Sequence, residues 1–282
     1  MHELLASGPE MAAPRTWQCL NPSGFRIAGP PRTGGRVARP MDSVVVDALS
    51  PQEDELALLA RGAPSAYRAW LDPRRWQEML PALSQDAWLA LPERDWLADW
   101  RTFLSWCMPS DAKMLVVKSP NHTFRIKAIR RAWPEARFVW TLRDPADTWQ
   151  SNRKMWAAMT SRYGLWPWDS GALDGLLAAA FREYALALRW AGETIGPDHL
   201  AFIAYDRLAS APAQTVHAVA ERFSLGGRDR WESPVQDYLA RSGARRPDSY
   251  AASDPLPEYG GALIGEIGGL HQRMLDSRHA LH

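Results

Sequence analysis

The sequence predicts an α/β protein in which a parallel sheet is flanked by helices. Three short apolar runs, at 114–117, 138–142 and 200–205, carry this prediction. Continuous apolar runs are typical of strands that are buried on both faces, and the segments between them show apolar residues at helical spacing. Strands that alternate with helices form βαβ units with parallel strands. A chain of 282 residues is long enough to bury the core of such a domain.

The chain before the first run is predicted to be mainly helical. Residues 1–8 resemble the last turns of a helix. At 50–53, Ser-Pro-Gln-Glu has the spacing of a capping box with proline at the first helical position, so we expect a helix to begin there. From 70 to 108, apolar residues recur every three or four positions between prolines, which predicts several short helices. We expect a helical lid over 50–110.

Helices are also predicted after each apolar run. Amphipathic segments follow the first two runs and extend to Ala132 and to about Ala158. A longer helix over 173–191 carries an apolar stripe, and another helix over 212–223 follows the third run. These elements form the expected βαβ core.

Composition excludes several classes of protein. The 33 Lys and Arg residues nearly balance the 32 Asp and Glu residues, which argues against a general nucleic-acid binder. No apolar run approaches the roughly 18 residues of a membrane span. Cys19 and Cys107 form no metal-binding motif, so we expect neither a metal site nor a disulfide, and a cytoplasmic location. The 15 tryptophans fit either core packing or an aromatic-walled pocket.

Two of the runs end in the same pattern, a basic residue followed by a helix-capping residue and proline. Lys118 and Ser119 follow the first run, and Arg143 and Asp144 follow the second. Consecutive parallel strands are usually neighbours, so we expect Lys118 and Arg143 to lie close together at the carboxyl edge of the sheet, beside two helix N-termini. The pattern predicts a site for an anionic ligand such as a nucleotide. Taken singly, each pattern also fits a solvated strand end.

The residues around these strand ends resemble the sulfotransferase superfamily, in particular its bacterial-type branch with KSPxH and RDP blocks. Ser151 lies eight residues after Arg143, as in the family. The matching blocks are Pro-Gln-Glu-Asp-Glu at 51–55, Val-Val-Lys-Ser-Pro-Asn-His at 116–122, Trp-Pro-Glu-Ala-Arg-Phe-Val at 133–139, Arg-Asp-Pro at 143–145 and Tyr-Asp-Arg-Leu at 205–208.

The resemblance implies a P-loop-NTPase-like sheet and transfer of a sulfuryl group from 3′-phosphoadenosine 5′-phosphosulfate (PAPS). It implies that Arg143 and Ser151 hold the 3′-phosphate and that Tyr205 lies near the adenosine. Lys118 would bind the donor and stabilise charge on the leaving phosphate oxygen. The acceptor would be a hydroxyl or amine of a small molecule or glycan, and no metal is implied. The sequence indicates neither the acceptor nor the oligomeric state.

The reaction also needs a general base, and a neutral imidazole suits that role. His122, expected in the first turn of the helix after Lys118, is the candidate. It lies four residues after the lysine, whereas the catalytic histidine of the cytosolic sulfotransferases lies two residues after it. Glu53 or Asp54 is the alternative base, although acidic residues are also common at a helix start.

The family's strand and loop that cradle the 5′-phosphosulfate have no counterpart in the sequence. Met-His-Glu-Leu-Leu-Ala at 1–6 is instead similar to the helix that follows that loop. We therefore expect a fold without its first strand and phosphosulfate loop, through a miscalled start or a truncated gene, with weak or absent turnover. The expected single domain over 1–282 comprises a remnant of the first helix at 1–8, a helical lid at 50–110, a nucleotide-binding βαβ core at 111–225 and a C-terminal tail at 226–282.

Two other functions are compatible with an anion site of this kind. A nucleotide kinase-like phosphotransferase needs a G-x-x-x-x-G-K-[ST] loop, and none of the four lysines follows a glycine. A non-catalytic nucleotide-binding remnant is the other alternative, and a truncated chain would favour it.

Overall fold

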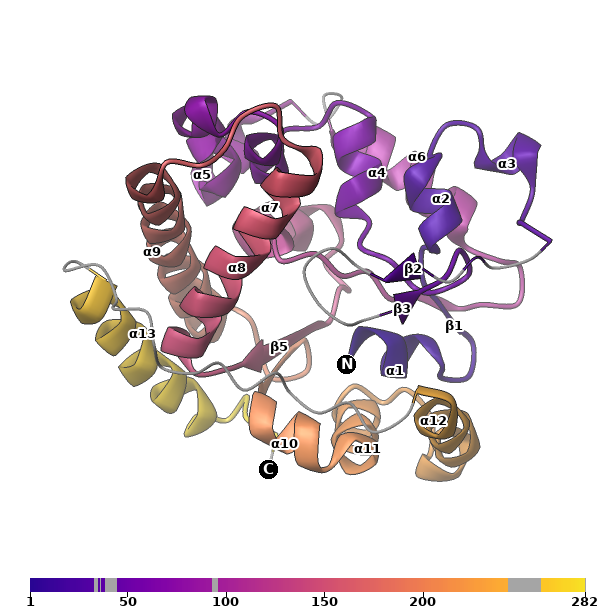
Figure 1. Cartoon of the computed structure of the whole chain (residues 1–282). Coiled ribbons are helices and arrows are strands. Elements are labelled where there is room, and N and C mark those ends of the chain that lie inside the picture. Colours follow the sequence, from indigo (N-terminus) through magenta and orange to yellow (C-terminus); the bar gives the residue numbers. More distant parts are fainter. Residues whose placement is uncertain (33–34, 36, 39–44, 93–95, 243–259, 282) are drawn as a thin grey trace.

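The computed structural model describes residues 1–282 except 33–34, 36, 39–44, 93–95, 243–259 and 282 (Figure 1). Its longest strands, β5 (Phe138–Leu142) and β6 (Leu200–Ala204), pair in parallel from Phe138 opposite Leu200 to Leu142 opposite Ala204. A second parallel pair joins β1 (Met11–Ala12) to β4 (Met114–Leu115). Helices surround these strands, and the predicted α/β class is confirmed.

The two parallel pairs are not joined into one ladder within the described residues. β4 pairs with β1, and β5 pairs with β6, so the expected adjacency of the first two predicted strands is wrong. A connecting helix fixes the parallel direction of two strands, but it leaves room for a further strand width between them. A cavity of about 1840 Å³ is lined by Val116 and Val117 after β4 and by Val139 and Thr141 of β5.

The region predicted to be a lid consists of short helices. Pro73 begins one of them and Pro81 lies within it, as expected from the interrupted apolar pattern. The helices are α4 (Glu55–Ala60), η1 (Ala66–Trp70), η2 (Pro73–Leu83), α5 (Gln85–Ala90) and α6 (Leu97–Cys107).

The predicted helix start at 50–53 is wrong, because α4 begins at Glu55. The Ser50 carbonyl accepts a hydrogen bond from the Thr16 N–H at 3.0 Å, and the Gln52 N–H donates to the Pro14 carbonyl at 2.9 Å. The backbone before α4 therefore pairs with the 14–16 segment instead of forming a helical turn. This pairing leaves Glu53 and Asp54 in a turn rather than in a helix.

The predicted helices after the apolar runs are present as α7 (His122–Ala132), α8 (Pro145–Tyr163), α9 (Ser170–Thr194) and α11 (Pro212–Arg222). The short helix α10 (Tyr205–Ser210) was not predicted, and Tyr205, which the sequence placed in the third strand, is its first residue. Asp144 caps α8, since its side chain accepts from the N–H groups of Ala146 and Asp147. The N-cap of α7 is Asn121 rather than Ser119; the Ser119 hydroxyl accepts from the Asn121 N–H at 3.1 Å and donates to Glu55.

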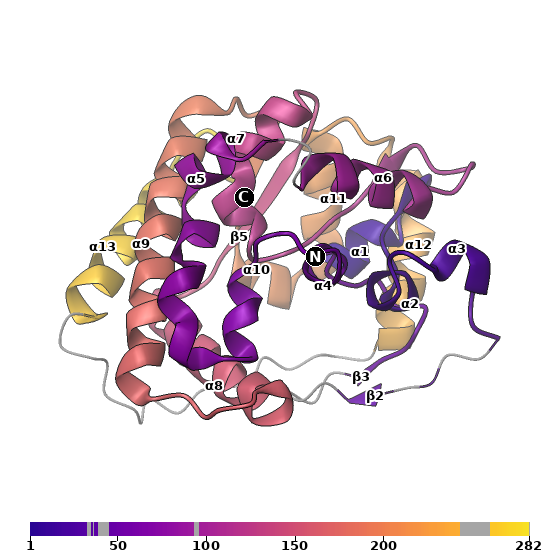
Figure 2. The same ribbon diagram turned by 90° about the horizontal axis from the view of Figure 1, so that it is seen from above.

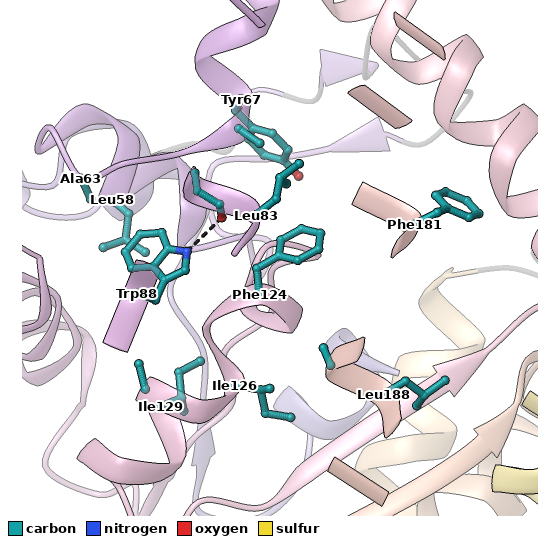
Figure 3. Close-up of a cluster of buried hydrophobic side chains, with 14 of the residues drawn as sticks. Leu58, Ala63, Tyr67, Leu83, Trp88, Phe124, Ile126, Ile129, Phe181 and Leu188 are labelled. Carbon is teal, nitrogen blue, oxygen red and sulfur yellow. Dashed lines mark hydrogen bonds between the residues drawn. The ribbon is translucent and has the colours of Figure 1, made fainter. Parts of the chain in front are cut away.

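The tryptophans mainly build the core. Trp88, Trp96, Trp100 and Trp149 are each at most 2 % exposed. Figure 3 shows the indole N–H of Trp88 donating to a backbone carbonyl, that of Ala82, at 2.9 Å. A buried indole N–H is stabilised by such a partner, so this bond fixes Trp88 of α5 against the end of η2 as well as filling space.

The chain ends pack against the parallel strands. The predicted helix at 1–8 is present as α1 (His2–Ala6). The 279–281 segment lies beside β6 and pairs with it in parallel through hydrogen bonds with Phe202. Figures 1 and 2 both show α13 beside α9. The sequence patterns did not indicate α2 (Thr16–Leu20), α3 (Phe25–Ala28), β2 (Val37–Ala38), β3 (Val45–Val46), α12 (Arg228–Ser242) or α13 (Gly260–Leu275).

Part of the predicted tail, 243–259, lies outside the described residues. Among the helices of the described part, none has both the length and the apolar character to cross a bilayer. Cys19 and Cys107 are buried free thiols. The cytoplasmic location stays a prediction.

Candidate active site

The cavity lined by β4 and β5 collects the site residues predicted from the sequence. They come from four different places in the chain, three of them just after a strand. The lining includes Lys118 after β4, His122 at the start of α7, Arg143 after β5, Ser151 within α8 and Tyr205 at the start of α10, together with Glu53 before α4.

Arg143 and Tyr205 join two strand ends at one side of the cavity. The guanidinium carbon of Arg143 lies 5.0 Å from the centre of the Tyr205 ring, within the range of a cation–π contact. Arg143 also donates to Asp147, one turn into α8, at 3.3 Å. Ser151 lies one further turn along the same helix. An arginine, a hydroxyl and an aromatic ring thus line one part of the wall, a combination suited to a phosphate beside a base.

Lys118 forms an ion pair with Glu53, which lies just before α4. Its ammonium nitrogen contacts one carboxylate oxygen of Glu53, and the other oxygen accepts from the Tyr67 hydroxyl at 3.0 Å. The Lys118 side chain is 44 % exposed, whereas that of Glu53 is 19 % exposed. Burial and the nearby Glu53 and Glu55 carboxylates raise the pKa of Tyr67 well above its ordinary value. Tyr67 therefore stays a hydroxyl donor to Glu53.

His122 faces protein groups at both ring nitrogens. Nε2 lies 3.0 Å from each carboxylate oxygen of Asp54, and Nδ1 lies 3.3 Å from Nη1 of Arg125. Asp54 is fully buried and also accepts from the Trp100 indole N–H at 2.7 Å. The rings of Trp100 and His122 are 4.9 Å apart. These contacts fix the imidazole in the wall of the cavity.

Beneath the cavity wall, Glu55 and Arg125 form a fully buried ion pair. Both guanidinium Nη atoms of Arg125 donate to the Glu55 carboxylate, which also accepts from the Ser65 and Ser119 hydroxyls. Burial alone would raise the pKa of Glu55, but Arg125 outweighs that effect and lowers the pKa to about 2. The pair stays ionised and ties the turn before α4 to the start of α7.

Sequence reasoning missed Tyr67 and Arg125 as parts of this site. The Pro-Gln-Glu-Asp-Glu block carried a signal for Glu53, but Tyr67 lies in an apolar helical pattern with no motif around it. Arg125 lies three residues after His122 on α7, and the sequence there does not distinguish a buried arginine from one exposed to solvent. Only the fold brings these residues to Glu53 and Glu55.

The arrangement of parallel strands, covering helices and basic residues after the strands is that of a P-loop-like α/β fold. The crystal structure of the sulfotransferase STF9 from Mycobacterium avium matches this fold with a TM-score of 0.63, at 18% sequence identity, over 97% of this chain and 70% of that one. The model of the Sulfotransferase family matches residues 1–229, and the chain belongs to that family. The predicted enzyme class, a transferase, is confirmed.

Two curated relatives are equally similar to this chain. The omega-hydroxy-beta-dihydromenaquinone-9 sulfotransferases Stf3 of Mycobacterium bovis and Mycobacterium tuberculosis are each 24% identical to this chain over 276 residues. The alignment covers 95% of this chain and 71% of each relative. The family assignment argues against the kinase-like alternative.

Proposed function

We propose that the protein transfers a sulfuryl group from PAPS to a hydroxyl group of an apolar small molecule. The observation that carries this proposal is the convergence of Lys118, Arg143, Ser151 and Tyr205 on one cavity. PAPS carries a phosphosulfate and a separate 3′-phosphate, so a donor site needs cationic groups at two places. Lys118 and Arg143, which follow different strand pairs, meet that need.

Each of the four residues has a distinct part in donor binding. Arg143 and Ser151 hold the 3′-phosphate, and Tyr205 lies against the adenosine. Lys118 binds the phosphosulfate. As the bond from sulfur to the 5′-phosphate oxygen breaks, its electron pair stays on that oxygen, and the ammonium group of Lys118 neutralises the charge. Positioning and charge stabilisation are what a loose sulfuryl-transfer transition state requires.

The cavity wall and the relatives together support an apolar acceptor that carries a hydroxyl. Leu83, Phe124 and Phe181, drawn in Figure 3, line the cavity together with Trp156 and Leu177. Apolar walls of this kind favour binding of apolar ligands. The printed name of the Stf3 relatives describes a menaquinone with an ω-hydroxyl as their substrate. A glycan or an amine acceptor has less support from these side chains.

The donor half of the proposal is tested by isothermal titration calorimetry with adenosine 3′,5′-bisphosphate, the product left when PAPS loses its sulfuryl group. We expect saturable binding by the full chain. Arg143→Ala should weaken it by roughly 10- to 100-fold, because a charged hydrogen bond contributes about 1.5–3 kcal/mol. The matched control is Arg189→Ala, since Arg189 pairs with Glu266 away from the cavity. No binding by the wild type would contradict the proposal.

The acceptor half is tested by incubating the chain with PAPS and a panel of hydroxylated isoprenoids, sugars and amines. Mass spectrometry would detect an added sulfuryl group. We expect product from a hydroxylated isoprenoid. Binding of the bisphosphate without product from any panel member would instead favour a nucleotide-binding protein without transferase activity.

A further inference from the structure

The ion pair between Lys118 and Glu53 places the proposed donor ligand and a carboxylate in competition. Glu53 lines the cavity beside Lys118, and Tyr67 holds its second oxygen. The Tyr67 ring is buried and stacks on Trp70 with ring centres 3.8 Å apart. Tyr67 is therefore a fixed partner, whereas the half-exposed Lys118 side chain is the partner that can move.

Glu53 differs in this respect from the other two candidate bases. Asp54 is fully buried against Trp100 and His122 and does not line the cavity. His122 can accept a proton from an acceptor only by giving up its contact with Asp54 or with Arg125. Glu53 can become available through displacement of a single flexible ammonium group.

Building on the function proposed above, we propose that Glu53 is the general base and that Lys118 is a latch which releases it when the donor binds. The phosphosulfate draws Lys118 away from Glu53. Loss of this ammonium partner leaves one carboxylate oxygen of Glu53 facing the cavity, while Tyr67 still holds the other. Glu53 then takes the proton of the acceptor hydroxyl while the acceptor oxygen bonds to sulfur and the bond from sulfur to the 5′-phosphate oxygen breaks. The donor consequently binds before the acceptor reacts.

The latch is tested by isothermal titration calorimetry with adenosine 3′,5′-bisphosphate at a fixed pH of about 7. The ligand carries the 5′-phosphate that Lys118 would meet. Glu53→Gln should bind the bisphosphate several-fold more tightly than the wild type, because no carboxylate then competes for Lys118.

The matched control is Glu135→Gln, which removes one negative charge from the lining of the same cavity. It should bind the bisphosphate with the affinity of the wild type. Equal affinities in the two variants, or an unchanged affinity in Glu53→Gln, would overturn the latch and leave the proposed function standing. Absence of any bisphosphate binding by the wild type would overturn the proposed function itself.

Turnover with PAPS and geranylgeraniol, a long-chain prenyl alcohol, tests the role as base. We expect Glu53→Gln to lower kcat by about 10²–10⁴-fold, the usual contribution of a general base, without raising KM for PAPS. Glu53→Asp should restore part of the activity. Wild-type kcat in Glu53→Gln would overturn the role; where the wild type gives no product, the calorimetric comparison decides.

Discussion

At the scale of single residues, three consecutive carboxylates meet three different environments. Glu53 lines the cavity and pairs with a half-exposed lysine, Asp54 is buried against His122, and Glu55 is buried against Arg125. Glu53 and Asp54 precede α4 and Glu55 is its first residue, so the three side chains project in different directions. A motif of adjacent acidic residues therefore combines a cavity-lining group with two groups that fix its surroundings.

The buried pair makes Arg125→Met a strongly destabilising substitution. It leaves the Glu55 carboxylate buried without its cation, which costs about 3–5 kcal/mol in proteins. Urea denaturation measures the loss in the free energy of unfolding. Arg75→Met is the control, because Arg75 pairs with Glu78 on the exposed face of η2, where such pairs contribute little. Similar, small losses in both variants would show that the buried pair does not hold the site together.

His2 gives the folded protein a predictable sensitivity to acid. Its ring nitrogen Nε2 lies 3.2 Å from the Val116 carbonyl, and burial lowers its pKa from 6.5 to about 4. Between these values the unfolded chain binds the proton more readily than the folded chain, so stability falls as the pH falls from about 6.5 to about 4. The loss from this residue is on the order of a few kcal/mol, since one pKa unit corresponds to about 1.4 kcal/mol.

Urea denaturation across this pH range, on the wild type and on His2→Gln, checks the assignment. Glutamine keeps a donor for the Val116 carbonyl but does not titrate. We expect a flatter stability profile in the variant, with a residual slope from His271 and His279, whose pKa values burial also lowers. Identical profiles would mean that His2 is not the group responsible.

At the scale of elements, the capping signals at 144–145 predicted the start of a helix correctly, whereas those at 50–53 and 119–120 did not. Asp144 and Pro145 start α8 as predicted, because both groups act on their own helix. Ser119 has the same local signature, and its hydroxyl oxygen accepts from the Asn121 N–H at 3.1 Å, but the hydroxyl also donates to Glu55, 64 residues away, and α7 begins three residues later. The capping pattern that begins at Ser50 does not start a helix for a similar reason, because the Ser50 carbonyl pairs with the Thr16 N–H. Long-range contacts of this kind leave no local pattern in the sequence.

The Asp144 cap allows a direct measurement of one such local rule. Asp144→Ala removes the acceptor for the N–H groups of Ala146 and Asp147 and should cost about 1 kcal/mol of unfolding free energy. Asp144→Asn keeps a capping oxygen and should retain most of that stability. Chemical denaturation of the two variants compares them. Equal losses would assign the effect to the charge of Asp144 rather than to its hydrogen bonds.

At the scale of the whole molecule, the site depends on how the two strand pairs are placed. The apolar runs predicted the strands and their direction, and the basic residues after them predicted the anion site. The sequence did not show that β4 and β5 pair with different partners, nor that Glu53 lies against Lys118, 65 residues away. The predicted absence of a first strand and phosphosulfate loop stays a prediction. The net charge of the chain does not indicate the anion site, because that site depends on two particular cations, Lys118 and Arg143.

This placement predicts how a donor ligand should change the dynamics of the protein. Lys118 follows one strand pair and Arg143 the other, so a bisphosphate that contacts both should stabilise both against local opening. At a concentration 100 times its Kd, a ligand stabilises the folded state by about 2.7 kcal/mol. Hydrogen exchange with adenosine 3′,5′-bisphosphate should therefore show slower exchange in β4 and the start of α7 as well as in β5 and α8. In Arg143→Ala, at the same ligand concentration, protection should weaken in both places together. Protection confined to β5 and α8 would mean that the ligand does not reach Lys118, and the cavity would then act as two separate sites.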